Sequence, residues 1–284
     1  MNRADPITMV AHQWPRHSEA EMARDFMVWR HLRVVRARGM RHVRGGFARL
    51  GGAQTAPVRS VYGVKMWPNW SDRTFAYCHY GTYGCYLADL IGSINFPFCF
   101  LDIGANQGLF SLIAGQNPAC EKIVALEPVG QTHGRLVANL EANALTSRAD
   151  ALNFGLSNET GEFPITLSAE HSGMATLSAH GAQLPGFHPK TTVRLETMAK
   201  LAQHLPDDIP IFVKIDVEGH EEVVLRELLS STKAQRVIGI FYEQDDRWTD
   251  AKAVGEILAS ANFAEQYIYG RGKHYDVLAV PQNL

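Results

Sequence analysis

The chain has 284 residues, 46% of them hydrophobic and 20% charged, and a formal net charge of −2 at pH 7. A chain of this size can bury one sizeable core, and its small net charge argues against a protein built mainly to bind nucleic acid. The four cysteines form no CxxC pair, which argues against a zinc site or a disulfide framework. Because the sequence shows neither a signal peptide nor an apolar run that could cross a bilayer, we expect a cytoplasmic protein without a transmembrane segment.

The first 57 residues are predicted to form a basic extension. Residues 1–60 contain eleven Arg and no Lys against four acidic residues, so the rest of the chain is acidic. Ser18 and Glu21 have capping-box spacing and apolar side chains follow at helical intervals, which predicts a basic amphipathic helix over residues 19–38. Residues 39–57, rich in Gly and Arg, are predicted as a linker. The extension could contact the body of the protein, an anionic substrate or a membrane surface, or pair two copies of the chain in a homo-oligomer through its helix. The alternative is a solvated or intramolecular face.

Residues 58–284 are predicted as one α/β domain, in which apolar runs alternate with helical patterns. Two strands joined by a turn are expected first, at 58–67 and 74–80. The later strands are expected at 98–103, 122–126, 151–155, 211–216 and 237–242. Helices are expected between them at 108–115, 130–143, 195–204, 221–230 and 250–261.

This alternation predicts a doubly wound, seven-stranded, mostly parallel sheet. Residues 265–269 and 274–280 flank Gly270-Arg-Gly272, so an antiparallel C-terminal hairpin is expected at one edge. Residues 156–194, rich in Gly, Ser, Pro and His, are predicted as an insertion with one or two hairpin strands, which could serve as a substrate lid.

Three motifs follow predicted strands at their carboxyl ends. The first, LDIGANQGL (101–109), contains Gly104 and Gly108, which allow a tight turn and a close approach of a ligand to the backbone. The second is LEP (126–128) and the third is KIDVEG (214–219). Since open α/β sheets bind ligands beyond the carboxyl ends of their strands, the three motifs predict one binding site.

Two carboxylates indicate which ligand this site takes. Asp102, beside the glycine turn, would repel a pyrophosphate but suits a ligand with an amino group and a sulfonium. Glu127 stands where a carboxylate can accept hydrogen bonds from both hydroxyls of a ribose. Asn106 occupies the place of the second glycine in the dinucleotide motif GxGxxG. These residues together favour S-adenosylmethionine over a nicotinamide dinucleotide.

The sequence resembles the FkbM family of methyltransferases from about residue 80 to about residue 245. The matching stretches are LDIGANQGLFSL (101–112), ALEP (125–128), NFGLSNETGEF (153–163), VRLETM (193–198) and VKIDVEGHEEVVL (213–225). The resemblance implies a class I, Rossmann-like methyltransferase fold. It also implies O-methylation, often of sugars, polysaccharide units or the hydroxyl groups of secondary metabolites.

The resemblance also implies roles for individual residues. The cofactor-binding residues, from the methionine end through the ribose to the adenine, would be Asp102, Gly104, Asn106, Gly108, Glu127, Asn153 and Phe154. Tyr83 and Tyr86 resemble the tyrosine-containing segment that precedes the first strand in the family, although Ala88 and Asp89 follow where a Glu is usual.

Methyl transfer to a hydroxyl needs an aligned nucleophile and a group that removes its proton. Asp216 is the first candidate, as a base or as a metal ligand; the alternative is a carboxylate tied to Lys214 or to the next helix. His220 and Glu243 are the other catalytic candidates, and a capping or solvated histidine is the alternative for His220. If a metal such as Mg²⁺ is present, Asp216 and Glu243 would bind it, because both offer oxygen ligands.

Further polar side chains are candidates for contact with the acceptor. His79, His171 and Glu218 are predicted on this side, together with Tyr83 and Tyr86. Glu218 could equally cap the following helix. His171 could lie in an exposed loop, and aromatic residues around His79 often pack an edge.

We therefore interpret the chain as an O-methyltransferase that acts on a hydroxyl of a small molecule, sugar or glycan. Three alternatives compete with this interpretation. An N-methyltransferase of nucleic acid or protein often carries an Asx-Pro-Pro-aromatic turn where this chain has Asp216-Val-Glu-Gly219. A non-catalytic protein that binds S-adenosylmethionine and a nicotinamide-dependent oxidoreductase are the other two. The sequence does not name the acceptor.

Overall fold

The computed structural model describes residues 32, 35, 56–168, 175–176, 187–270 and 272–282. Apart from two isolated positions, the predicted basic helix lies outside these residues, as do nearly all of the linker and His171. The division of the chain at residue 57 and the pairing of two copies through the helix therefore stay predictions.

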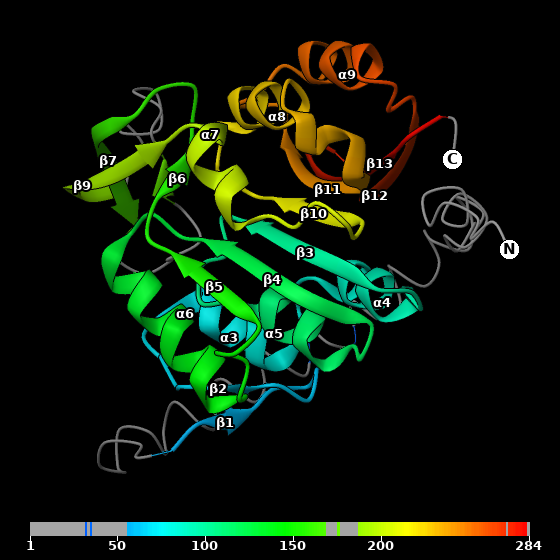
Figure 1. Cartoon of the computed structure of the whole chain (residues 1–284). Helices are drawn as coiled ribbons and strands as arrows, with labels where there is room; N and C mark the ends of the chain where they lie inside the picture. Colours follow the sequence, from blue (N-terminus) through cyan, green and yellow to red (C-terminus); the bar gives the residue numbers. More distant parts are fainter. Residues whose placement is uncertain are drawn as a thin grey trace, which may run out of the picture.

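A seven-stranded sheet runs through the middle of the molecule in the order β12-β13-β11-β10-β3-β4-β5 (Figure 1). Its strands are β3 (Phe98–Ile103), β4 (Cys120–Leu126), β5 (Ala149–Leu152), β10 (Ile211–Ile215), β11 (Val237–Asp245), β12 (Glu265–Gly270) and β13 (His274–Val280). Strand β13 is antiparallel to both of its neighbours, β12 and β11, whereas β11, β10, β3, β4 and β5 pair in parallel. The predicted mostly parallel sheet with an antiparallel C-terminal hairpin is confirmed.

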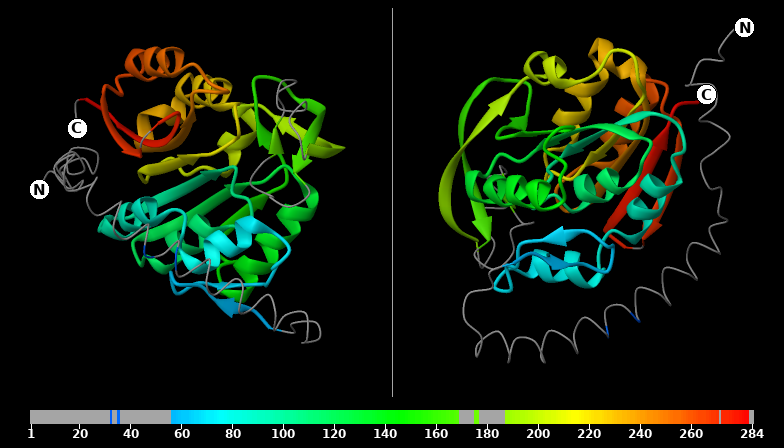
Figure 2. Two further views of the ribbon diagram at one scale, coloured as in Figure 1. Left: turned by 180° about the vertical axis from the view of Figure 1, so that it is seen from behind. Right: turned by 60° about the horizontal axis from the view of Figure 1, so that its bottom comes forward.

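Helices cover both faces of this sheet (Figures 1 and 2). One face carries α4 (Cys85–Ser93), α5 (Leu109–Gln116) and α6 (Gly130–Ala142). The other carries α7 (Met198–Leu201), the 3-10 turns η2 (Ala202–His204) and η3 (Thr232–Arg236), α8 (Glu221–Leu229) and α9 (Ala251–Ser260). Every residue of β3 is buried, as expected for a parallel strand covered on both faces. Among the described helices, none has the length and apolar content that crossing a membrane requires.

Side chains alternate between the two faces along the central strands. Phe100 and Phe212 belong to the core beneath α4, α5 and α6, whereas Leu101 and Val213 belong to the core beneath α8 and α9. Because successive side chains of a strand point to opposite faces, Asp102 of β3 and Lys214 of β10 lie on the same face as Phe100 and Phe212.

The start of the domain differs from the prediction. Residues 58–67 form two short antiparallel strands, β1 (Val58–Arg59) and β2 (Lys65–Met66), instead of one strand. The predicted strand at 74–80 is a helix, α3 (Arg73–Tyr80), and helix α4 was not predicted. The aromatic run favours a strand by propensity, but Asp72 caps the helix at its start and Gly81, with φ +66°, ends it.

The predicted insertion contains a second sheet, with strand order β6-β9-β7-β8. Its strands are β6 (Gly155–Leu156), β7 (Gly161–Ser168), β8 (Ala175–Thr176) and β9 (Phe187–Glu196). It lies on the side of the molecule away from the β12–β13 hairpin (Figure 2). Since β9 continues to Glu196, the helix predicted from 195 starts only at Met198. The role of this region as a substrate lid stays a prediction.

The cap of α3 provides a test of how this helix packs against the glycine turn that contains Gln107. Asp72 is 7% exposed and accepts hydrogen bonds from Thr74 N and from Gln107 Nε2 on the glycine loop. We expect Asp72→Ala to lower the free energy of unfolding by about 2–3 kcal/mol, because it removes a cap and leaves a buried amide with one partner fewer. Asp250→Ala removes the exposed cap of α9 and should cost only about 1 kcal/mol. Urea denaturation measures both, and equal losses would contradict the coupling of α3 to the loop.

Candidate active site

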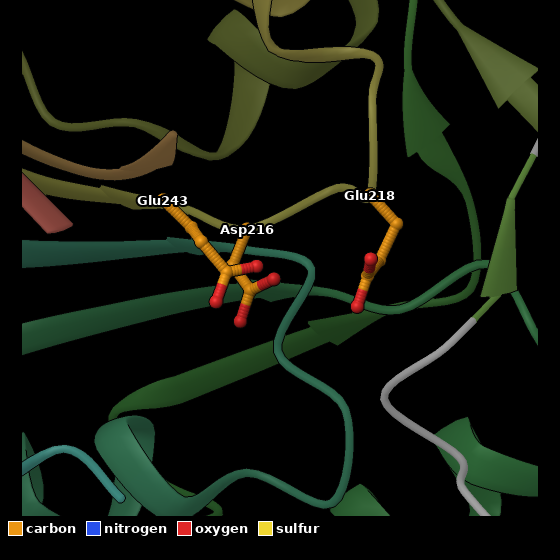
Figure 3. A group of neighbouring side chains, drawn as sticks. All are labelled: Asp216, Glu218 and Glu243. Atoms are coloured by element: carbon orange, nitrogen blue, oxygen red, sulfur yellow. The ribbon is translucent and has the colours of Figure 1, made fainter. Parts of the chain in front are cut away.

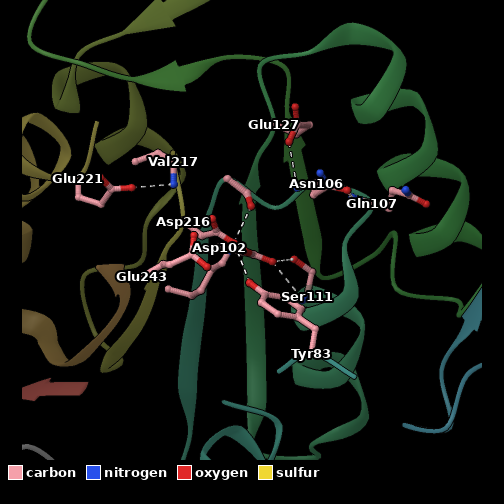
Figure 4. Close-up of polar contacts among 12 residues, drawn as sticks. Tyr83, Asp102, Asn106, Gln107, Ser111, Glu127, Asp216, Val217, Glu221 and Glu243 are labelled. Carbon is pink, nitrogen blue, oxygen red and sulfur yellow. Dashed lines mark hydrogen bonds and ion pairs between the residues drawn. The ribbon is translucent and has the colours of Figure 1, made fainter. Parts of the chain in front are cut away.

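The carboxyl ends of four neighbouring strands bring the predicted carboxylates to one edge of the sheet (Figure 4). Asp102 lies in β3, Glu127 follows β4, and Asp216 follows β10. Glu243 lies inside β11, which continues to Asp245 because it pairs with β13 there. The prediction that β11 ends at 242 is therefore wrong, but Glu243 still reaches the same edge.

Lys214 is at the centre of this edge and is 3% exposed. Its Nζ donates to Gly104 O at 2.6 Å and lies 3.3 Å from Asp102 Oδ1 and 3.5 Å from Asp216 Oδ2. Burial alone would lower the pKa of Lys214, but the carboxylates of Asp216 and Asp102 raise it above its ordinary value. The ammonium therefore stays charged. The sequence indicates Lys214 only as a residue that binds the Asp216 carboxylate.

Asp102 lies beneath the glycine turn and is 0% exposed. Its Oδ2 accepts hydrogen bonds from Ser111 Oγ (2.7 Å) and Ser111 N (3.2 Å) at the start of α5. The expectation that Asp102 contacts the amino group of a ligand needs correction. The alternation along β3 turns this side chain toward α5, where its carboxylate accepts hydrogen bonds from Ser111 and forms an ion pair with Lys214.

The glycine turn is shaped by close packing against its neighbours. Gly104, Asn106 and Gly108 have positive φ values of 78°, 51° and 90°. A Cβ atom on Gly104 would lie 1.8 Å from Asp216 O, and one on Gly108 would lie 2.6 Å from Leu136 Cδ1. The positive φ values of Gly104 and Gly108 confirm the predicted tight turn, and the close contacts with the loop after β10 and with α6 also require glycine there. The predicted approach of a ligand to the backbone stays a prediction.

Glu127 is held at the end of β4 by backbone donors. Its Oε2 accepts from Asn106 N and its Oε1 accepts from Val129 N, each at 2.9 Å. Burial raises the pKa of Glu127 to about 7, although the two backbone donors act in the opposite direction. Each oxygen can still accept one more hydrogen bond.

The two residues predicted near the adenine, Asn153 and Phe154, lie in different environments. Asn153 is exposed, and its Nδ2 donates to Glu127 O at 2.9 Å, so it lies beside the edge. Phe154 is 7% exposed and packs in the core beneath α8 and α9. Phe154 therefore contributes to packing, because the chain leaves β5 and enters β6 at this point.

Three acidic residues, Asp216, Glu218 and Glu243, meet at this edge of the sheet (Figure 3). One carboxylate oxygen from each of Asp216, Glu218 and Glu243 lies within 4.8 Å of the others. Burial, together with the negative charge of Asp216, raises the pKa of Glu243 to about 7. Burial and the charges of Glu243 and Asp216 raise the pKa of Glu218 well above its usual range. Oxygen atoms grouped in this way suit a cationic ligand or a hard divalent cation.

The predicted acceptor-side residues are only partly brought together. Tyr83 Oη donates to Asp216 Oδ2 at 2.8 Å (Figure 4). Tyr86 instead packs against Tyr269, with ring centroids 5.0 Å apart. His79 is 6% exposed among the rings of the α3 region, so the structure favours the packing interpretation for it.

One neighbour of the acidic group was missed by sequence reasoning. His274 Nε2 lies 2.5 Å from Glu243 Oε1, and this partner raises the pKa of His274 to about 9. His274 and Glu243 lie on adjacent strands, β13 and β11. The predicted hairpin could have indicated this pair only if its register against β11 had been known.

The described contact of His220 is with Ser157. This histidine is the residue before α8, and its Nε2 lies 3.1 Å from Ser157 Oγ, just after β6. Burial lowers the pKa of His220. Glu221, the first residue of α8, accepts from Gly219 N at 3.1 Å in the loop before the helix, and the capping alternative considered for Glu218 stays a prediction.

Known proteins with related sequences are methyltransferases. A family model described as the methyltransferase FkbM domain matches residues 102–275. Methyltransferase sdnD from Sordaria araneosa is 31% identical over 180 residues, which cover 55% of this chain and 68% of sdnD. Hexuronic acid methyltransferase AglP from Haloferax volcanii is 26% identical over 165 residues, which cover 58% of this chain and 63% of AglP.

A solved structure of a methyltransferase FkbM from Methylobacillus flagellatus is also similar. It has a TM-score of 0.44 and 13% identity, and the match covers 75% of this chain and 56% of that chain. The chain thus spans less than two thirds of this protein and of AglP.

The glycine turn yields a prediction about stability. We expect Gly104→Ala to lower the free energy of unfolding by more than about 3 kcal/mol, because the new Cβ would collide with Asp216 O at a residue with positive φ. Gly134→Ala, in α6 with no atom within 4 Å of its Cβ, should be neutral or stabilising by up to about 1 kcal/mol. Urea denaturation compares the two, and a Gly104→Ala protein as stable as the wild type would contradict this packing.

Proposed function

We propose that this chain, which belongs to the FkbM methyltransferase family, transfers the methyl group of S-adenosylmethionine to a hydroxyl group of a sugar, a glycan or a secondary metabolite. The chain is a methyltransferase by family membership; the cofactor, the acceptor and the residue roles are the proposal. The observation that carries it is the set of carboxylates around the glycine turn, with Glu127 on one side and Asp216, Glu218 and Glu243 on the other.

The residues present fit S-adenosylmethionine, which carries a sulfonium, an amino group and a ribose diol. Glu127 offers two carboxylate oxygens to the ribose hydroxyls, as in other nucleoside sites of open α/β sheets. The acidic group on the opposite side is complementary to a positive charge. A pyrophosphate would bring negative charge to the same edge, so a nicotinamide dinucleotide fits less well. When bound, S-adenosylmethionine supplies an activated methyl group.

The acceptor-side roles rest on position. Asp216 and Glu243 lie at the edge where an acceptor hydroxyl would have to approach, and either carboxylate can take the hydroxyl proton. The hydrogen bond from Tyr83 fixes the orientation of Asp216. Glu218 and Tyr83 are the residues that we assign to acceptor binding. His220, which faces Ser157, is the least supported of the three catalytic candidates.

A sugar or a secondary-metabolite alcohol is favoured over nucleic acid or protein. AglP is described as a hexuronic acid methyltransferase, which supports a sugar acceptor. The acidic edge would repel the phosphates of a nucleic acid. A bound divalent cation is a second candidate role for Asp216 and Glu243, because the acidic group supplies the oxygen ligands that Mg²⁺ prefers.

Binding of S-adenosylhomocysteine (SAH) tests the cofactor. We expect wild-type protein to bind SAH but not NAD in calorimetry. Since the pKa of Glu127 is raised to about 7, about a tenth of this group is ionised at pH 6 and most of it at pH 8. An ionised carboxylate is the better acceptor for two hydroxyls, so SAH affinity should rise up to about tenfold from pH 6 to pH 8.

The controls isolate Glu127. Glu127→Gln should weaken SAH binding about tenfold at pH 8 and reduce the pH dependence, leaving only the part that comes from ionisation of Glu243, whose pKa is also about 7. Glu141→Gln, an exposed change on α6, should leave both unchanged. Tighter binding of NAD than of SAH would refute the cofactor assignment, and an unaltered pH dependence in Glu127→Gln would refute the role of this carboxylate.

Methyl transfer from labelled S-adenosylmethionine tests the acceptor. We expect label on oxygen when the panel contains uronic-acid glycosides, neutral glycosides and polyketide alcohols. Asp216→Asn should lower kcat by about 10²- to 10⁴-fold, whereas Asp246→Asn, on the exposed loop after β11, should not. Label found only on nucleic acid or protein nitrogen would overturn the proposed acceptor class. Activity that disappears with a chelator and returns with Mg²⁺ would assign the acidic group to a cation.

A further inference from the structure

Lys214 connects two segments of the chain that are distant in sequence and build the site. Its ammonium reaches the carbonyl of Gly104 in the turn after β3, Asp102 beneath that turn, and Asp216 in the loop after β10. These two loops also touch directly, because Asp216 N donates to Ile103 O at 3.1 Å. The turn and the acceptor-side carboxylate therefore share one charged partner.

We propose that Lys214 is a positioning residue that fixes the glycine turn against Asp216, so that the cofactor-binding turn and the acceptor-side carboxylate keep one relative geometry. The inference rests on the proposed cofactor-binding function. Lys214 acts through Gly104 and Asp216 and, at 3% exposure, does not itself touch the substrates. Its contribution is orientation, on which methyl transfer between two bound molecules depends.

The contacts of Lys214 exceed what neutralising Asp102 requires. Asp102 Oδ2 already accepts two hydrogen bonds from Ser111, and its Oδ1 is 3.3 Å from the ammonium. The shortest bond of Lys214, at 2.6 Å, goes to the Gly104 carbonyl. Buried ion pairs are often replaceable by apolar residues without loss of stability, so a pair at this place is poorly explained by stability alone.

The surroundings keep the ammonium charged and restrict its movement. The Phe110 ring lies 5.8 Å from Lys214 Nζ, within the range of a cation–π contact. Asp216 and Asp102 raise the pKa of Lys214, so its charge is constant across the pH range of ordinary assays. A neutral side chain of similar length would keep the packing but lose the hydrogen bond to Gly104 and the ion pair with Asp216.

Four variants test the proposal by SAH calorimetry and urea denaturation. Lys214→Met removes the ammonium, Asp102→Asn removes the buried charge, and the double variant removes both. Lys233→Met is the matched control, because Lys233 is also buried (8% exposed) and donates to the carbonyls of Leu205 and Pro206, away from the site. Lys214→Met leaves the buried charge of Asp102 unpaired, which could make the protein too unstable to study. The double variant leaves no unpaired buried charge, so SAH binding can be measured in it even then.

We expect Lys214→Met and the double variant to bind SAH about tenfold to a hundredfold more weakly than wild type. We expect the double variant to recover most of the urea midpoint lost in Lys214→Met. Asp102→Asn and Lys233→Met should bind SAH within about threefold of wild type.

Two results would overturn the proposal. The double variant could regain wild-type SAH affinity together with its stability, which would reduce Lys214 to a counter-ion of Asp102. Alternatively, Asp102→Asn could weaken SAH binding as much as Lys214→Met, which would give the role to the carboxylate. Wild-type protein that does not bind SAH at all would instead refute the proposed function, so the two failures are distinguishable.

Discussion

One buried ammonium organises the candidate site. Lys214 lies in the sheet between Asp102 and Asp216, and it also bonds the carbonyl of Gly104. A buried carboxylate such as Asp102 is costly unless a positive charge or hydrogen bonds compensate it. Because the compensating charge comes from the neighbouring strand β10, the ammonium that stabilises buried Asp102 also fixes the loops after β3 and β10 relative to each other, through Gly104 and Asp216.

The rest of the edge is acidic and locally strained. Glu127, Asp216, Glu218 and Glu243 converge there because parallel strands end at the same edge, and their burial raises the pKa of Glu127 and of Glu243 to about 7. Glu218 has a positive φ of 52°, which is uncommon for a residue with a Cβ atom. Such concentrated charge and strain is tolerated where a ligand compensates it. A cationic cofactor is complementary to this edge.

The alternation of side chains along the strands explains which part of the site could be predicted from the sequence. Phe100 and Asp102 share one face of β3, and Phe212 and Lys214 share the same face of β10. The two apolar runs were predicted as strands, so the shared face of Asp102 and Lys214 was within reach of the sequence. Their direct pairing was not, because it depends on the order of β3 and β10 in the sheet and on their register.

The sequence by itself determined the alternation of strands and helices, the glycine turn, and the carboxylates at the strand ends, because periodicity and turn chemistry are local. The strand expected at 74–80 was wrong because two equally local signals, the cap Asp72 and the terminating Gly81, override the strand propensity between them. Only the tertiary structure decided that Asp102 is buried, that Glu243 meets His274, and that His220 faces Ser157. Each of these depends on contacts between segments distant in sequence, and local sequence patterns do not determine strand register or side-chain packing.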